Sequence, residues 1–62
     1  MNILEARRFL RTALRSPKAR PVLFEMGYAT IATAPERTND WTMLAAAHKV
    51  KRELQKRYPN DD

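Results

Sequence analysis

The apolar side chains of the first fifteen residues recur every three or four positions, and this repeat constrains the fold more than any other feature of the sequence. At about 100° per residue, six of them fall within one arc of about 140°. These six are Ile3, Ala6, Phe9, Leu10, Ala13 and Leu14. The dipeptide Ser16-Pro17 ends the pattern, because the residue before a proline avoids the helical region. The repeat predicts an amphipathic helix over residues 2–15.

A second repeat of the same kind predicts a helix over residues 40–58. Asn39 or Asp40 caps its start and Pro59 ends it. Its apolar positions again lie on one arc, and its last turn holds cations that complement the helix dipole. The chain is therefore expected to begin and end with a long amphipathic helix.

A short helix is predicted between them, over residues 21–27. Pro21 can open a helix because its fixed φ suits the first helical position, and Gly27 can end it in a left-handed conformation. The predicted fold class is all-α: a small three-helix domain over residues 1–58, with 59–62 as a disordered tail.

The segment 28–38 allows more than one interpretation. Its Tyr, Thr and Ile side chains favour a short strand at 28–33, which needs a second chain to pair with and implies a homodimer. A helix-turn-helix over 22–33 is another alternative, although it holds no long polar side chain to read base edges. The run Thr33-Ala-Pro-Glu36 matches a capping box, which predicts a helical turn beginning at Ala34.

A chain of 62 residues buries only about 60% of the surface its unfolded form exposes, so the core is thin and dimerisation would strengthen it. No cysteine is present to form a disulfide. The expected core residues are Ile3, Phe9, Leu10, Leu14, Val22, Leu23, Phe24, Met26, Ile31, Met43, Leu44, Val50, Leu54 and Tyr58.

The composition argues against catalysis and against metal or cofactor binding. The chain has one histidine, His48, one glycine and no cysteine, so it lacks a thiolate or imidazole metal set and a Gly-rich phosphate loop. No nucleophile, base and orienting group can be assembled from it. No apolar run approaches the roughly 20 residues of a membrane span. We expect a non-enzymatic cytoplasmic protein without a catalytic residue, metal or cofactor.

The net charge of +5 is concentrated at the two ends of the chain. Residues 1–20 hold six basic side chains and one acidic, residues 49–58 hold five and one, and the segment between them is slightly acidic. Spacings of three and four place two rows of cations on separate helix faces. The N-terminal row is Arg8, Arg11 and Arg15, and the C-terminal row is Lys49, Arg52 and Lys56.

These rows predict an acidic partner, because arginine and lysine bind phosphates and carboxylates. The first hypothesis is a regulatory or accessory module that binds nucleic acid through its phosphates, without sequence specificity. The second is a protein-interaction module, such as a small inhibitor, adaptor or phage-type accessory protein, with Trp41 as its anchor. Solvated helix faces are the simplest alternative to both. The candidate contacts are Arg7, Arg8, Arg11, Arg15, Lys18, Arg20, Lys49, Arg52 and Lys56.

Overall fold

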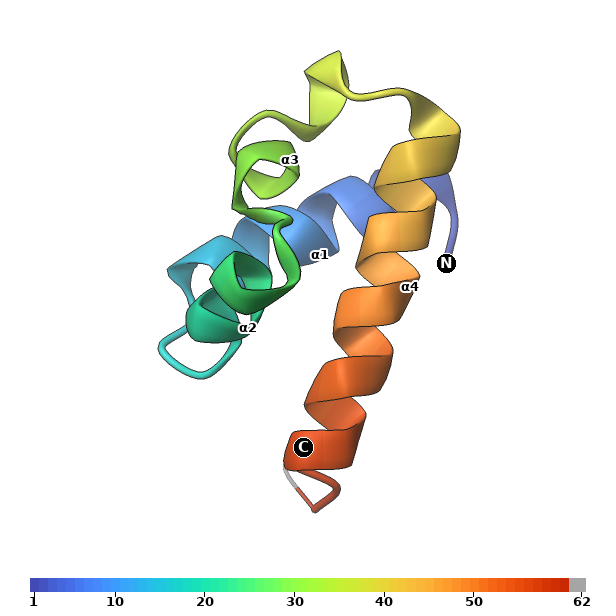
Figure 1. Ribbon diagram of the computed structural model, residues 1–62. Helices are drawn as coiled ribbons and strands as arrows, with labels where there is room; N and C mark the ends of the chain where they lie inside the picture. Colours follow the sequence, from blue (N-terminus) through green and yellow to red (C-terminus); the bar gives the residue numbers. More distant parts are fainter. Residues whose placement is uncertain (61–62) are drawn as a thin grey trace.

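The computed structural model describes residues 1–60 of the chain, and every regular element in this part is helical (Figure 1). In chain order the elements are α1 (Ile3–Arg15), α2 (Ala19–Met26), α3 (Ala29–Thr33), the 3₁₀ turn η1 (Pro35–Arg37) and α4 (Asp40–Arg57). The predicted all-α class is confirmed, with α1 and α4 as the long helices and α2 as the short central one.

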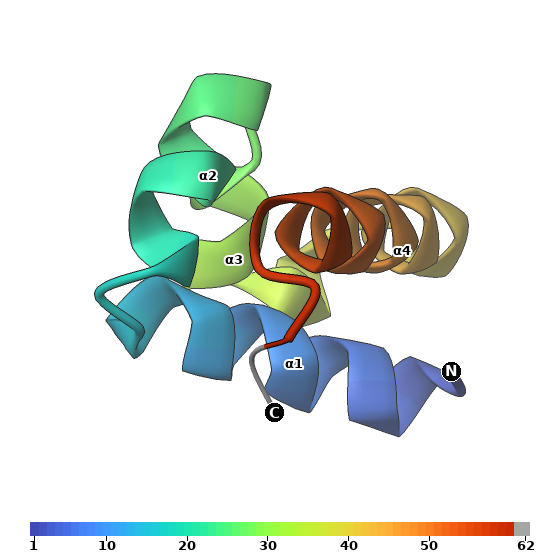
Figure 2. The ribbon, with the colours of Figure 1, turned by 90° about the horizontal axis from the view of Figure 1, so that it is seen from below.

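The two long helices cross, and the short helices close one side of the crossing. Figure 2 shows α4 nearly end-on above α1, with α2 and α3 beside it over the C-terminal half of α1. The whole measures 31 × 20 × 16 Å. One face of α1 is therefore covered by the other helices, and its opposite face is open to solvent.

Both long helices begin at an asparagine cap. The Asn2 Oδ1 accepts a hydrogen bond from the backbone N–H of Glu5 (2.8 Å), and the Glu5 carboxylate accepts one from the N–H of Asn2 (3.2 Å). The Asn39 Oδ1 accepts from the N–H groups of Trp41 (2.9 Å) and Thr42 (3.2 Å). These bonds satisfy donors that have no partner within the helix. The predicted helices 2–15 and 40–58 are correct to within one residue at each end.

The central helix α2 begins two residues before the predicted position. Ser16 provides its start, because the Ser16 Oγ accepts from the N–H of Ala19 (3.3 Å) and its carbonyl accepts from the N–H of Arg20 (2.9 Å). The helix ends where predicted, at Gly27, whose φ of 78° is left-handed. The N–H of Gly27 donates to the carbonyls of Leu23 and Phe24.

The left-handed backbone conformation at Gly27 favours glycine over any other residue, and substitution of Gly27 tests this. A Cβ added there would meet nothing within 4 Å, so an alanine would be opposed only by its own backbone conformation. We expect Gly27→Ala to lower the free energy of unfolding by about 1 to 2 kcal/mol, measured by urea denaturation followed by circular dichroism. Gly27→Asn is the control and should cost less, because asparagine tolerates this conformation. Equal losses for the two variants would contradict the argument.

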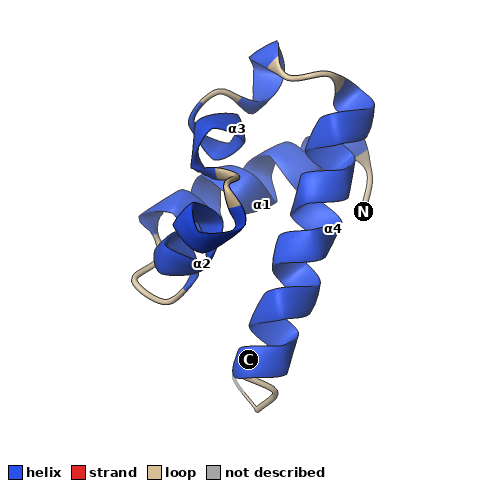
Figure 3. Ribbon diagram, in the orientation of Figure 1, coloured by secondary structure: helices blue, strands red, loops and turns tan. Residues whose placement is uncertain are grey.

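The alternative of a strand at 28–33 is wrong, because this segment forms α3 (Figure 3). The N–H of Tyr28 donates to the carbonyl of Leu23 (2.8 Å), which turns the chain directly into the new helix. Ala32 is then buried in the core that includes α1. A helix satisfies these backbone groups within the segment, whereas a lone strand leaves them needing a second chain. The strand-paired homodimer loses its structural basis.

The segment 22–33 has the helix, glycine and second helix of a helix-turn-helix. Its second helix, however, has only five residues, Ala29–Thr33, and no lysine, arginine, asparagine or glutamine. A recognition helix needs such side chains to contact base edges. The motif here serves packing, because α3 lies against α1.

The capping box expected at Thr33–Glu36 does not form. The Thr33 hydroxyl instead donates to the carbonyl of Ala29 (2.9 Å), and Glu36 forms an ion pair with Arg11. A helical turn does follow at η1 (Pro35–Arg37), where Pro35 is buried. The capping box is therefore replaced by a bond within α3 at Thr33 and by a tertiary ion pair at Glu36.

The core is built around alanines to a greater extent than predicted. Of the expected core residues, Leu10, Val22, Leu23, Met43 and Val50 are buried, and most of the others pack partly buried against them. Seven further residues are buried that were not expected in the core: Ala6, Ala13, Ala19, Ala32, Pro35, Ala46 and Ala47. The small side chains of these alanines allow the helices of the core to pack closely.

Two large residues that the sequence predicts to be in the core, Phe24 and Tyr58, are exposed in the structure. Phe24 is 57% exposed, because α2 buries Ala19, Val22 and Leu23 and so turns the next position outward. Tyr58 is 37% exposed, since α4 ends one residue before it. The predicted tail begins with the exposed Pro59 and Asn60, while its last two residues, 61–62, lie outside the described part of the chain.

Candidate nucleic-acid interface

Two members of the N-terminal row, Arg8 and Arg15, lie on the side of α1 that faces away from the other helices. Leu10 marks the buried side of α1. At about 100° per residue, Arg8 and Arg15 are about 140° to 160° round from Leu10. Both are exposed and have no ion-pair partner among residues 1–60. They project into solvent on the open face of the molecule.

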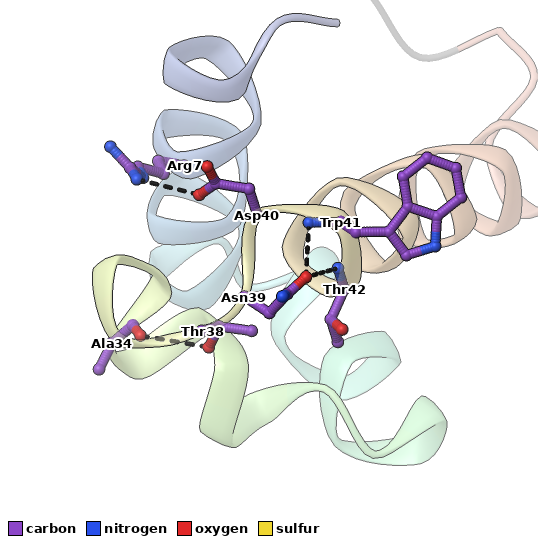
Figure 4. Close-up of polar contacts among 7 residues, drawn as sticks. All are labelled: Arg7, Ala34, Thr38, Asn39, Asp40, Trp41 and Thr42. Atoms are coloured by element: carbon purple, nitrogen blue, oxygen red, sulfur yellow. Dashed lines mark hydrogen bonds and ion pairs between the residues drawn. The ribbon is translucent and has the colours of Figure 1, made fainter.

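Arg11, the third member of the row, and its neighbour Arg7 join α1 to η1 and to the start of α4. The Arg7 guanidinium donates to the Asp40 carboxylate at 3.3 Å (Figure 4). Arg11 pairs with Glu36 of η1. These contacts connect the middle of α1 with the start of α4 and with the turn before it. Arg7 and Arg11 were both expected to contact a partner, and in the structure each is already neutralised by a carboxylate.

The C-terminal row lies on the outer surface of α4. Val50 is buried, and Arg52 is about 200° round the helix from it. Lys49 and Lys56 lie about 100° to 120° from Val50, on the side of Glu53. All three members of the row are exposed. Their only ion-pair contact within residues 1–60 joins Lys56 Nζ to Glu53 at 4.0 Å, so this row is almost uncompensated.

Arg57 connects α4 with α2 and takes no part in the row. Its guanidinium lies 2.7 Å from the Glu25 carboxylate and 2.9 Å from that of Glu53. The hydrogen bond to Glu53, and then the one to Glu25, raise the pKa of Arg57 above its usual value. The two carboxylates thus favour the charged form of Arg57, which links the end of α4 to α2.

The two rows point to opposite sides of the molecule. On α4, Leu54 and Tyr58 share a hollow with Phe9 of α1, so this side of α4 faces α1. The Glu53 side faces α2 through Arg57, and the C-terminal row lies further round in the same direction. The N-terminal row faces away from α4 in turn. The rows are back to back, and a single flat surface cannot touch both.

The remaining candidate cations lie near exposed aromatic rings. The Lys18 ammonium is 5.1 Å from the centre of the Tyr58 ring, and the Arg20 guanidinium is 5.6 Å from that of Phe24. Cations at such distances are attracted to the ring face. Lys18 and Lys51 also line the hollow of about 280 Å³ between the end of α1 and α4. Lys51 was not among the predicted contacts, although its place in the C-terminal run of basic residues could have suggested it.

The fold uses every described acidic side chain internally. Glu5 forms the cap of α1, and the other four pair with cations: Glu25, Glu36, Asp40 and Glu53. The cations that receive them are chiefly Arg7, Arg11 and Arg57. The positive charge of the chain is thus left on a defined set of exposed side chains, of which the C-terminal row is the largest continuous group on one helix.

Trp41 is the most exposed large apolar side chain of the described residues, at 81%. Figure 4 shows its indole pointing away from the Arg7–Asp40 pair, out from the first turn of α4. His48 is exposed two turns further along the same helix. Trp41 and His48 lie on the face that also carries Arg52, since the three positions fall within about 40° of one another.

Within residues 1–60, no three His, Cys, Asp or Glu side chains gather where they could hold a metal ion. In the same part of the chain no helix combines the length and apolar character needed to cross a bilayer. Comparison with protein-family models, with curated proteins and with solved structures gives no match.

Proposed function

We propose that this protein is a small non-enzymatic module that binds nucleic acid through the phosphate backbone, with the C-terminal row as its main contact. The observation that carries this proposal is which charged side chains are already paired within the fold. The described acidic side chains cap α1 or form ion pairs with cations, whereas Lys49 and Arg52 have no acidic partner within residues 1–60.

The arrangement of these cations suits a charged polymer. Steps of three and four residues place neighbouring members of the row about 5 to 6 Å apart at their Cβ atoms. A row on one helix can follow consecutive phosphates, and the release of condensed counterions then drives binding. Such contacts carry no sequence information by themselves, so binding is independent of base sequence.

The two rows contribute unequally under this proposal. Double-stranded DNA is stiff, with a persistence length of about 50 nm, so one duplex meets only one side of a molecule this small. The N-terminal row faces the other way, and its Arg11 is paired with Glu36. The C-terminal row is therefore the primary site. Arg8 and Arg15 can contact nucleic acid only if a second molecule binds to the opposite side of the protein.

The salt dependence of binding tests the proposal. With three phosphate contacts, the logarithm of the affinity for duplex DNA should fall against the logarithm of salt concentration with a slope of about −2.7. The affinity then drops about 40-fold between 50 and 200 mM salt. Fluorescence anisotropy with a labelled 20-base-pair duplex measures this slope. A salt-independent affinity, or no binding at 50 mM salt, would contradict the proposal.

A protein-interaction module is the second candidate, and the exposure of Trp41 favours it. Tryptophan is among the residue types enriched at the centres of protein interfaces. A pull-down with and without nuclease separates the two candidates. Partners lost on nuclease treatment support nucleic-acid binding, while an acidic protein retained after it, and released by Trp41→Ala, supports the second candidate.

A further inference from the structure

The indole of Trp41 is presented on a rigid element and is not packed into the fold. Asn39 holds the first turn of α4 through the backbone N–H groups of Trp41 and Thr42, so the ring is attached to a fixed helix start. Burying a tryptophan contributes more apolar surface than almost any other side chain. A chain with so thin a core leaves this ring 81% exposed, so its fold does not depend on it.

A shallow hollow of about 280 Å³ lies beside the ring. Its lining is apolar apart from one imidazole, and consists of Met1, Trp41, Leu44, Ala45 and His48. An open hollow against an indole accommodates a flat ring that stacks on the tryptophan and leaves its polar edge in water. The faces of nucleobases have this character.

The same face of α4 continues into the C-terminal row. Trp41, His48 and Arg52 share one side of the helix, and Arg52 lies about 16 Å along the axis from Trp41. A stacking platform next to cations that hold the backbone is the combination by which proteins bind single strands. Away from its ends a duplex keeps the base faces stacked inside, so Trp41 can meet a base face there only where bases are unpaired.

We propose that the outer face of α4 binds nucleic acid that has unpaired bases, with one base stacked on Trp41 beside His48 and phosphates further along the same strand held by Lys49 and Arg52. This inference rests on the proposed function and adds the class of nucleic acid to it. Single strands, bulges and duplex–single-strand junctions are bound in preference to a continuous duplex.

The intrinsic fluorescence of the protein tests this directly, because Trp41 is the only tryptophan in the chain. The full-length protein is titrated with oligothymidine, with a blunt duplex of equal phosphate number, and with inorganic polyphosphate, which carries charge without bases. Oligothymidine should quench the emission. The duplex and the polyphosphate should bind, as followed by anisotropy or by competition, without comparable quenching. Equal quenching by all three would overturn the inference.

Substitution of the ring gives an independent measurement. Trp41→Ala should weaken binding of oligothymidine roughly 5- to 150-fold and change duplex affinity less than twofold. Trp41→Phe should recover part of the loss, because it keeps an aromatic face. The matched control is Leu4→Ala, which removes another exposed apolar side chain from a different helix and should leave both affinities unchanged. Circular dichroism confirms that each variant is folded.

The outcomes separate this inference from the function on which it rests. If Trp41→Ala leaves the two affinities unchanged, or lowers both equally, base stacking is excluded and phosphate binding stands. If the protein binds neither nucleic acid at 50 mM salt, both proposals fail. If Trp41→Ala releases an acidic protein that survives nuclease treatment while affinity for oligothymidine is unchanged, the ring serves a protein partner and the inference is wrong.

Discussion

Replacing Leu10 by alanine is expected to lower the free energy of unfolding by about 2 to 5 kcal/mol, which is a large share of the stability that a chain of this size has. Leu10 is fully buried and belongs to the core cluster that holds Leu23, Met43 and Val50. Truncation removes buried methyl groups and leaves a cavity that helices already packed through alanines cannot close. Native domains have roughly 0.05 to 0.15 kcal/mol per residue, or about 3 to 9 kcal/mol here.

Urea denaturation followed by circular dichroism at the helical band measures this loss. Leu4→Ala is the matched control, because it makes the same chemical change on the same helix at a side chain that is 55% exposed. It should alter the free energy of unfolding by less than about 0.5 kcal/mol. Similar losses in the two variants would mean that α1 does not bury the face the structure assigns to it.

The second large effect is expected on binding. Replacing Lys49 and Arg52 together by glutamine should weaken duplex binding about 30-fold at 150 mM salt and bring the logarithmic salt slope about 1.8 units closer to zero. Each substitution removes one phosphate contact and the counterion release that accompanies it. Glutamine keeps the length of the side chain and a good helix propensity, so the fold should be unaffected.

The control for this variant removes the same charge from the opposite face. Arg8→Gln together with Arg15→Gln also lowers the net charge by two, at exposed positions without ion pairs among residues 1–60. It should change the affinity less than about threefold, because only the general field of the protein is reduced. If the two double variants weaken binding equally, contact by the C-terminal row is excluded and bulk charge explains the affinity.

The helices of this protein were predictable because their signals are local. The three- and four-residue repeats, the Ser16-Pro17 stop and the glycine at the end of α2 each act within one or two turns of chain. The residue at which α2 begins and the helical conformation of residues 28–33 are harder to predict from the sequence. The short helix α3 exists because Ala32 can be buried in the core that includes α1, and that contact joins distant parts of the sequence.

The sequence predicts which residues belong to the candidate site, but only part of how they are arranged in space. Helical spacing was sufficient to place Arg8 with Arg15, and Lys49 with Arg52, on common faces. It could not show that Arg7 is paired with Asp40, 33 positions away. Nor could it show that Trp41 is exposed, because a position at the edge of an apolar arc is buried or free according to which neighbouring helix covers it.

The two charged rows and the amphipathic helices that carry them follow from the amino-acid sequence alone, because both depend on a periodicity shorter than one helix. The direction in which each row points is set by the tertiary structure. The side of each helix that is covered depends on how α1 and α4 cross, and here the crossing leaves the rows back to back. It also decided which cations are neutralised, because ion pairs such as Arg11 with Glu36 form only once distant segments have been brought together.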